Sequence, residues 1–372
     1  MTNGDFLETE IRSLIAQEGP LPIAEFMNIC LTHPTHGYYT TRTPLGGRGT
    51  NDASKGDFIT APEVSQMFGE LIGVWCLQMW QYLGSPKAFN LVEIGPGRGT
   101  LMHDLLRATK SMPRFTAAAR ICLVEISPTL HQQQREVLSG HNITWLDDLT
   151  KLPKLPTLII ANELLDALPF HQWIKVEGRW LQRAIAVRDD KLIFATRASQ
   201  LDSKQMPAGH EQLANGKIFE ISPAREACIS SIANQFDQTN GAALFIDYGH
   251  LKSAFGDTFQ AIKNHAYSSP LQNLGTSDLT SHVDFQPLIT AAKLCNNEAP
   301  DPMTQSEFLI NMGLLERAGK LGAGKDETTQ MGLSNDVHRL ASDDQMGRLF
   351  KVMAFGKTQQ PKMKFPGFPV FG

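Results

Sequence analysis

The stretch Leu91-Val-Glu-Ile-Gly-Pro-Gly-Arg-Gly-Thr-Leu101 decides the fold of this 372-residue chain. Its first four residues are typical of a buried β-strand, and the apolar residues after the glycines repeat at helical spacing. A strand, a glycine turn and a helix start together place backbone N–H groups at a helix N-terminus, where a ligand can bind. The alternative is a plain tight turn between a strand and a helix, with no ligand.

The spacing of the glycines separates two kinds of ligand. The glycines are Gly95, Gly97 and Gly99, whereas the dinucleotide pattern G-x-G-x-x-G would need its last glycine at Thr100. Glu93 lies two residues before the first glycine. A buried carboxylate there would repel a pyrophosphate but can hold an ammonium group. We therefore predict that Glu93 and the three glycines bind S-adenosylmethionine, a cation with an amino-acid tail, rather than NAD or FAD.

Polar side chains follow three later strands, which are expected at 121–124, 143–145 and 158–161. Because ligands of open α/β sheets bind at the carboxyl ends of the strands, these side chains are expected at the same site. The residues assigned to the cofactor there are Glu125, Ile126, Asp147 and Asn162. Glu125 suits the ribose hydroxyls, or else caps the next helix, and both roles are compatible. Asp147 could meet the adenine amino group.

A glycine-rich stretch at 44–57 precedes a strong helix. The sequence Thr60-Ala-Pro-Glu63 predicts a capping box at the start of that helix, and an apolar stripe continues to Leu83. We expect Asp57, Phe58 and Thr60 to form a lid over the cofactor. A bland flexible loop, with Thr60 acting only as a helix cap, is the alternative.

Alternating strands and helices predict an α/β fold with a parallel sheet. The organisation expected along the chain is an N-terminal helical region and flap at 1–85, a cofactor-binding core at 86–250 with an antiparallel β meander at 170–198, a helical C-terminal cap at 251–345, a final core strand at 346–358 and an extended or mobile tail at 359–372.

Composition limits the function classes. A net charge of −4 argues against general nucleic-acid binding, which needs a basic face. The longest apolar stretch, 71–83, is too short to span a bilayer, so we expect no membrane insertion. The five cysteines contain no C-x-x-C and sit among apolar neighbours, so we expect free thiols in the cytoplasm and no disulfide. His282 and Asp284 lack a third ligand nearby, so we expect no metal site.

Six motifs match one family in the same order: 56–70, 93–100, 125–128, 162–169, 246–249 and 278–285. Over residues 8–357 the chain resembles the MidA-like S-adenosylmethionine-dependent methyltransferases, relatives of a respiratory complex I assembly factor with protein-arginine methyltransferase activity. The resemblance implies a Rossmann-like class I methyltransferase sheet and a protein substrate, possibly a respiratory complex I subunit. Leu146 stands where a polar residue beside the adenine is expected. The chain lacks a mitochondrial presequence, which fits a bacterial, cytoplasmic member of the family.

An arginine acceptor would set a chemical problem. The pKa of a guanidinium is above about 12, so its nitrogens carry no free lone pair at neutral pH. Paired carboxylates can align it by fork-like hydrogen bonds. Glu163 and Asp166 are three residues apart and can face the same side, so we expect them to contact the acceptor as catalytic residues. Otherwise Glu163 caps a turn and Asp166 accepts from a neighbouring backbone N–H.

Three functions stay open at this level. The first is a protein-arginine N-methyltransferase acting on a respiratory complex subunit or assembly partner. The second is a methyltransferase for a small molecule or another side chain. The third is a non-catalytic assembly factor that binds S-adenosylmethionine. A dehydrogenase is disfavoured by Thr100, and the oligomeric state cannot be predicted.

Overall fold

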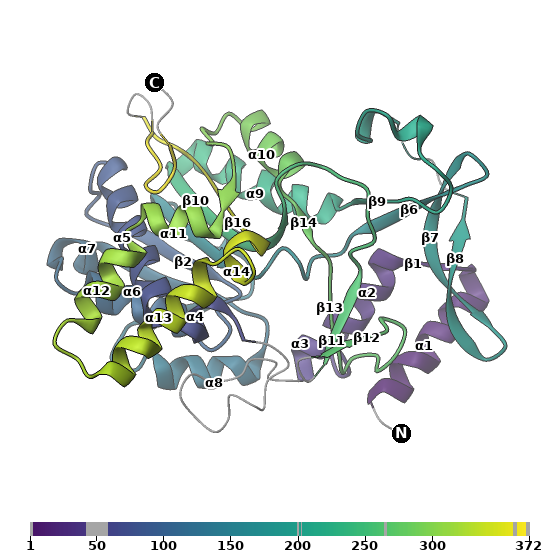
Figure 1. The fold of residues 1–372 in the computed structure, drawn as a ribbon, viewed down its shortest axis with the longest axis horizontal. Helices are drawn as coiled ribbons and strands as arrows, with labels where there is room; N and C mark the ends of the chain where they lie inside the picture. The colour runs from purple at the N-terminus through teal and green to yellow at the C-terminus, as the bar shows by residue number, and fades with distance from the viewer. Residues whose placement is uncertain are drawn as a thin grey trace.

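The computed structural model describes residues 3–41, 59–198, 201, 203–263, 266–359 and 363–369. One large sheet organises the molecule (Figure 1). Its strands, in spatial order, are β15 (Met303–Thr304), β16 (Phe350–Lys357), β10 (Gly241–His250), β5 (Thr157–Asn162), β2 (Phe89–Ile94), β3 (Ala119–Val124) and β4 (Ile143–Leu146), and β14 (Val283–Asp284) pairs with the end of β10. The strands from β10 to β4 are parallel to one another, whereas β16 pairs antiparallel with both of its neighbours, β10 and β15. The predicted α/β fold is confirmed.

Alternate residues of the strands fill two apolar cores, one on each face of the sheet. In β5, Leu158 and Ile160 point to one core, and Ile159 and Ala161 point to the other. Because side chains alternate between the two faces of a strand and both sets are apolar here, β5 is buried on both faces, which is typical of a covered parallel sheet. The helices of this part of the chain are α5 (Gln66–Tyr82), α6 (Thr100–Thr109), α7 (Pro113–Ala118), α8 (Pro128–Val137), α9 (Pro223–Thr239) and α10 (Phe285–Leu294).

Helices α5 and α6 pack against each other at very short range. A Cβ atom built on Gly69 would lie 2.7 Å from Cβ of Asp104, and one on Gly73 would lie 3.0 Å from the carbonyl oxygen of Leu105. Glycines four residues apart therefore let the two helix backbones approach. This contact fixes α6, which begins directly after the glycine turn.

The capping box predicted at Thr60 is absent. The chain forms a short helix α4 (Ala61–Val64), breaks at Ser65, and starts again as α5. Thr60 makes no side-chain cap bond, whereas the Ser65 hydroxyl accepts from the backbone N–H of Met67 at 3.5 Å. Ser65 is extended, with φ −152°, so the single helix predicted from the apolar stripe is divided.

A second part of the molecule lies at the N-terminal side, on the right of Figure 1. Its elements are α1 (Asn3–Glu18), β1 (Leu21–Pro22), α2 (Ile23–Thr32), α3 (Tyr38–Thr41), β6 (His171–Val176), β7 (Arg179–Arg188), β8 (Lys191–Arg197), β9 (Ile218–Ile221), β11 (Gln260–Lys263), β12 (Ala266–Ser268) and β13 (Asp278–Thr280). Strands β6, β7 and β8 form an antiparallel meander within the expected range 170–198.

The N-terminal helices share a core with this meander. Leu7 and Phe26 pack with Ile185 of β7 and with Leu279 of β13 in one buried cluster. The expected N-terminal helical region is therefore divided between two parts of the molecule. Residues 3–41 lie on the antiparallel sheets, whereas α4 and α5 lie on the large sheet. The split follows from the two separate apolar faces that these segments cover.

The helical cap is shorter than the predicted range 251–345. It consists of α11 (Gln305–Asn311), α12 (Leu314–Gly322), α13 (Glu327–Ala341) and α14 (Met346–Leu349). Residues 260–280 form the three-stranded sheet β12-β11-β13, and α10 covers the large sheet instead. The tail was expected to be extended or mobile, and its described part, 363–369, packs on the molecule, because Met363, Phe365 and Phe368 are buried against the core.

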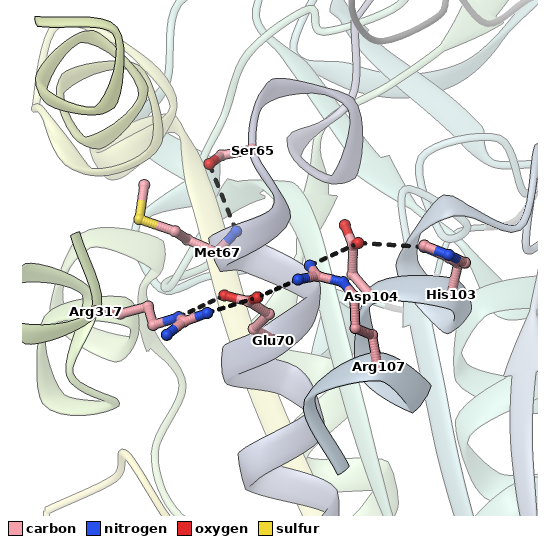
Figure 2. Close-up of polar contacts among 7 residues, drawn as sticks. All are labelled: Ser65, Met67, Glu70, His103, Asp104, Arg107 and Arg317. Carbon is pink, nitrogen blue, oxygen red and sulfur yellow. Dashed lines mark hydrogen bonds and ion pairs between the residues drawn. The ribbon is translucent and has the colours of Figure 1, made fainter. Parts of the chain in front are cut away.

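Ion pairs attach the cap to α5 and α6 (Figure 2). Glu70 of α5 has a buried side chain, 6% exposed, and accepts from both sides. Arg317 of α12 donates to the Glu70 carboxylate from Nε at 2.7 Å and from Nη2 at 2.9 Å. Nη1 of Arg107, on α6, lies 2.9 Å from Oε1 of Glu70. Arg107 also contacts Asp104 at 3.0 Å.

None of the helices in the described ranges is both long enough and apolar enough to traverse a lipid bilayer.

Candidate active site

A pocket of about 290 Å³ lies at the carboxyl ends of β2, β3 and β5. Among its described lining residues, six are acidic and only Arg98 is basic. The acidic residues are Glu63, Glu93, Glu125, Glu163, Asp166 and Asp278. Because the pocket is concave and its charges are mostly of one sign, it favours a cationic ligand.

The glycine turn forms one wall of the pocket. Gly95, Gly97 and Gly99 have φ values of +65°, +54° and +86°, which side chains with a Cβ rarely adopt. Gly95 and Gly97 line the pocket, whereas Gly99 is the N-terminal cap residue of α6 and lies outside the lining. The turn is held from outside, since the Gln134 side chain donates to the carbonyl of Gly97 at 2.7 Å.

Glu93 lies at the end of β2, buried and facing the pocket. Its Oε2 atom has no hydrogen-bond partner among the described residues. Burial raises the pKa of Glu93 to about 8, and the charge of Glu125 adds to this, while a hydrogen bond from the Met102 backbone acts against it. A buried acceptor oxygen without a donor is a place where an ammonium group of a ligand fits.

Glu125 contacts the start of the next helix and also lines the pocket, where its predicted contact with the ribose remains a prediction. Its Oε1 atom accepts from the backbone N–H of Ser127 at 2.8 Å, which holds the start of α8. The same carboxylate lines the pocket and accepts weakly from Gln134 at 3.4 Å. Ile126 lines the pocket with 56% of its surface exposed, an apolar face of the kind an adenine ring needs.

Other predicted cofactor residues are placed differently. Asp147 is not among the lining residues, and its carboxylate pairs with Lys151 at 2.5 Å on the surface. The structure thus gives no support to its adenine role, because the Asp147 side chain is 65% exposed and occupied by Lys151. Thr60 does line the pocket. Asp57 and Phe58 lie outside the described residues.

The opposite wall is a tight loop after β5. Asn162, Glu163 and Asp166 all line the pocket, so the structure brings these predicted residues together. Glu163 has a left-handed backbone with φ +53°, an uncommon conformation for a residue other than glycine. Its carboxylate accepts from the Asn162 side chain at 3.0 Å and from the backbone of Ala61. Burial, followed by the charge of Asp166, raises the pKa of Glu163 to about 8.

Asp247 on β10 anchors this loop. Its Oδ2 atom accepts from the backbone N–H groups of Leu164, Leu165 and Asp166 at 3.1, 2.8 and 3.1 Å. The next residue, Tyr248, donates its hydroxyl to Oδ2 of Asp166 at 2.6 Å. The remaining oxygen of Asp166 is buried without a hydrogen-bond partner in the described part of the chain.

Arg225 on α9 holds the loop from beneath. Its Nε donates to the carbonyl of Leu165 at 2.6 Å, and Nη2 donates to the hydroxyl of Ser281 at 2.6 Å. Sequence reasoning missed Arg225 as well as the roles of Asp247 and Tyr248. The motif 246–249 was the available signal for the last two, but a single arginine in a helix start gave none.

Two further polar pairs close the pocket. The Thr100 hydroxyl donates to Oε1 of Glu63. The Tyr39 hydroxyl donates to Oδ1 of Asp278 at 2.8 Å. All four side chains belong to the pocket lining. Across the described ranges, no group of three or more His, Cys, Asp and Glu side chains is arranged to hold a metal ion.

Comparison with known proteins identifies the family and the cofactor of this chain. Residues 71–303 match the family described as "Putative S-adenosyl-L-methionine-dependent methyltransferase". The chain belongs to this family. The family's fold and cofactor agree with the predicted Rossmann-like sheet and with S-adenosylmethionine, and the enzyme is an S-adenosylmethionine-dependent methyltransferase.

Relatives cover nearly the whole chain. Protein arginine methyltransferase NDUFAF7, mitochondrial, from Xenopus tropicalis is 34% identical over 100% of this chain and 90% of its own length. The protein of the same name from Homo sapiens is 33% identical over 91% of this chain and 81% of its own length. These similarities confirm the family resemblance inferred from the six motifs.

A crystal structure from Burkholderia thailandensis with bound S-adenosyl-homocysteine superposes with a TM-score of 0.83. It is 26% identical and covers 95% of this chain and 92% of its own. The residues of the pocket fit such a ligand. Glu93 offers a buried oxygen for the ammonium, and Arg98 is the one described cation in the lining that could meet the carboxylate.

Proposed function

We propose that this methyltransferase transfers a methyl group to arginine side chains of a partner protein. The observation that carries the proposal is the acidic acceptor wall. Asp166 Oδ1 and Asn162 Oδ1 are buried acceptors with no donor in the described chain, and both residues line the pocket beside Glu163. The relatives named protein arginine methyltransferase support the same acceptor class.

A guanidinium suits this wall for a chemical reason. It carries five N–H donors in a plane and no acceptor, so carboxylate and amide oxygens can bind it on its edges. Hydrogen bonds that the guanidinium donates to carboxylates draw positive charge to the bonded nitrogens and leave electron density at the attacking nitrogen. Glu163 and Asp166 are the residues we assign to this role.

Bound S-adenosylmethionine supplies the methyl group as an electrophile. The attacking nitrogen forms a bond to the methyl carbon as the carbon–sulfur bond breaks, and the nitrogen then loses one proton. Glu163 accepts that proton, since its pKa of about 8 lies far closer to neutrality than that of an exposed glutamate. Its left-handed turn aims the carboxylate at the pocket, and Asp247 keeps the turn in place.

The test begins with transfer to protein. The purified chain is incubated with radiolabelled S-adenosylmethionine and a lysate from cells that lack it, and the labelled band is digested and examined by mass spectrometry. Methylarginine in the labelled peptide is the expected result. Label on a small molecule, or on lysine or another side chain, would contradict the arginine proposal and favour a different methyltransferase activity.

The acceptor and the location are proposed more narrowly from the family resemblance. We propose a cytoplasmic enzyme whose acceptor is a subunit or assembly partner of a respiratory complex. Cell fractionation with an antibody checks the location, and mass spectrometry of the purified complex from cells with and without the protein checks the acceptor. An arginine that is methylated equally in both cell lines would contradict this choice of acceptor.

A further inference from the structure

Two residues of the pocket come from outside the large sheet. Tyr39 lies on α3 and Asp278 begins β13, so both belong to the part that carries the N-terminal helices. The Tyr39 hydroxyl donates to Oδ1 of Asp278 at 2.8 Å, and both side chains line the pocket. Asp278 is only 3% exposed. A buried carboxylate is therefore presented to the ligand by a segment that sequence reasoning did not assign to the site.

The strand carrying Asp278 is tied directly to the acceptor loop. The backbone N–H of Ser281, three residues later, donates to the carbonyl of Asp166 at 3.2 Å. Arg225 spans the same junction, because Nη2 reaches the Ser281 hydroxyl while Nε reaches the carbonyl of Leu165. These bonds fix the position of Asp278 relative to Asp166.

The charges of these groups act on one another within the pocket. The charge of Asp278 contributes to raising the pKa of Glu163, after burial and the charge of Asp166. Burial and the same two aspartates raise the pKa of Tyr39 well above its ordinary value, so its hydroxyl stays protonated as a donor. Glu163, Asp166 and Asp278 all line the same pocket, so their carboxylates are available to one ligand.

We propose that Asp278 and Tyr39 form a second arm of the acceptor site, beside Glu163 and Asp166. Asp278 binds the guanidinium nitrogens that do not receive the methyl group, and Tyr39 is a positioning residue that orients its carboxylate. The inference rests on the proposed arginine acceptor. It explains why Tyr39 of α3 and Asp278 of β13 line the same pocket as the loop after β5.

The arm also predicts selectivity. A guanidinium is planar and can be held from two edges by separate carboxylates, whereas a lysine ammonium is a compact point charge. An acceptor site with carboxylates on two arms therefore discriminates arginine from lysine by geometry and not only by charge.

The experiment measures transfer and cofactor binding separately. Asp278→Asn, Tyr39→Phe and the control Asp301→Asn, a change at an exposed residue, are assayed against serial dilutions of the lysate with radiolabelled S-adenosylmethionine. We expect Asp278→Asn to raise the apparent acceptor KM about tenfold or more and Tyr39→Phe about threefold, as loss of a charged and of a neutral partner respectively. Calorimetry with S-adenosylhomocysteine should give a Kd within about twofold of the unchanged protein, because these residues do not contact the donor.

Two outcomes would overturn the inference. One is an unchanged acceptor KM in Asp278→Asn, and the other is a loss of S-adenosylhomocysteine affinity as large as the loss of transfer. Tyr39→Phe keeps the ring and its packing, so it serves if Asp278→Asn does not fold in a thermal melt. The nature of the methylated residue is read independently. Methylarginine with an unchanged KM refutes the arm alone, whereas a raised KM with label on another side chain refutes the guanidinium as the acceptor group and leaves Asp278 at the acceptor site.

Discussion

The two walls of the pocket are built in different ways. The donor wall is almost continuous in sequence, because Glu93, Gly95 and Gly97 lie within five residues of one another. The acceptor wall is assembled from α3, the loop after β5, α9, β10 and β13. A ligand common to a whole family can be held by one local motif, whereas the acceptor site depends on long-range contacts that each segment makes only after folding.

The largest effect is expected on the acceptor wall. Glu163→Gln removes the proton acceptor and one charge beside the guanidinium, so turnover should fall about 100-fold or more. The Kd for S-adenosylhomocysteine should stay within about twofold, which calorimetry measures. In the unchanged protein, turnover should rise from pH 6 to 8, because Glu163 must lose its proton and its pKa is about 8. Wild-type turnover in Glu163→Gln would contradict the assignment of Glu163 to methyl transfer and, with it, the functional distinction between the two walls.

A smaller loss should follow a change beneath the acceptor loop. Asp247→Asn replaces the carboxylate by an amide. The amide oxygen can keep the three backbone N–H groups that donate to Oδ2, but the NH2 group then faces the backbone N–H of Tyr248, which donates to Oδ1 at 2.9 Å in the unchanged protein. We expect the free energy of unfolding to fall by about 1–3 kcal/mol, with lower turnover because the turn at Glu163 loosens. Chemical denaturation measures the first effect and the radiolabel assay the second. Unchanged values of both would show that the loop does not depend on Asp247.

The donor wall should respond in binding. An ammonium is held best by ionised Glu93, whose pKa of about 8 means that the carboxyl is largely protonated at pH 6. The affinity for S-adenosylhomocysteine should therefore increase with pH between 6 and 8, by at most tenfold per unit. Glu93→Gln should weaken binding about tenfold at pH 8 and abolish this pH dependence. Asp301→Asn is the control, since Asp301 is exposed and lies outside the pocket lining.

The smallest effect is expected far from both walls. Arg317→Met removes one of the two arginines on Glu70 and should lower the free energy of unfolding by about 1 kcal/mol, since Arg107 still compensates the buried charge. Cofactor affinity and turnover should not change. A loss of S-adenosylhomocysteine affinity in this variant would show instead that the cap acts on the donor wall through α5 and α6.

Local patterns predicted much of this molecule from sequence. The apolar runs at 91–94, 121–124 and 158–161 are strands of the large sheet, and the left-handed φ values of the glycines explain why that turn could be recognised. What failed was decided by tertiary context. Ser65 divides a helix that the continuous apolar stripe had predicted to be single. In the described part of the tail, Phe365 and Phe368 pack into the apolar core.

The acceptor wall shows the same limit. Glu163 and Asp166 could be chosen because they are close in sequence, and the structure places both at the pocket. Arg225 could not, because nothing near it in the sequence marks it. Asp278 begins the motif 278–285 and Tyr39 follows Tyr38, but their meeting at the pocket depends on contacts that span most of the chain. Asp147 was assigned by its place after a strand, yet its carboxylate pairs with Lys151 outside the pocket.

A crystal structure with bound S-adenosylhomocysteine tests the central claim most directly, since it shows which way the ligand lies between the two walls. We predict its ammonium at Glu93, its adenosine along Glu125 and Ile126, and its sulfur facing Glu163 and Asp166. A sulfur atom turned away from these two carboxylates, or an ammonium placed at the acceptor wall, would contradict the division of the pocket into donor and acceptor sides.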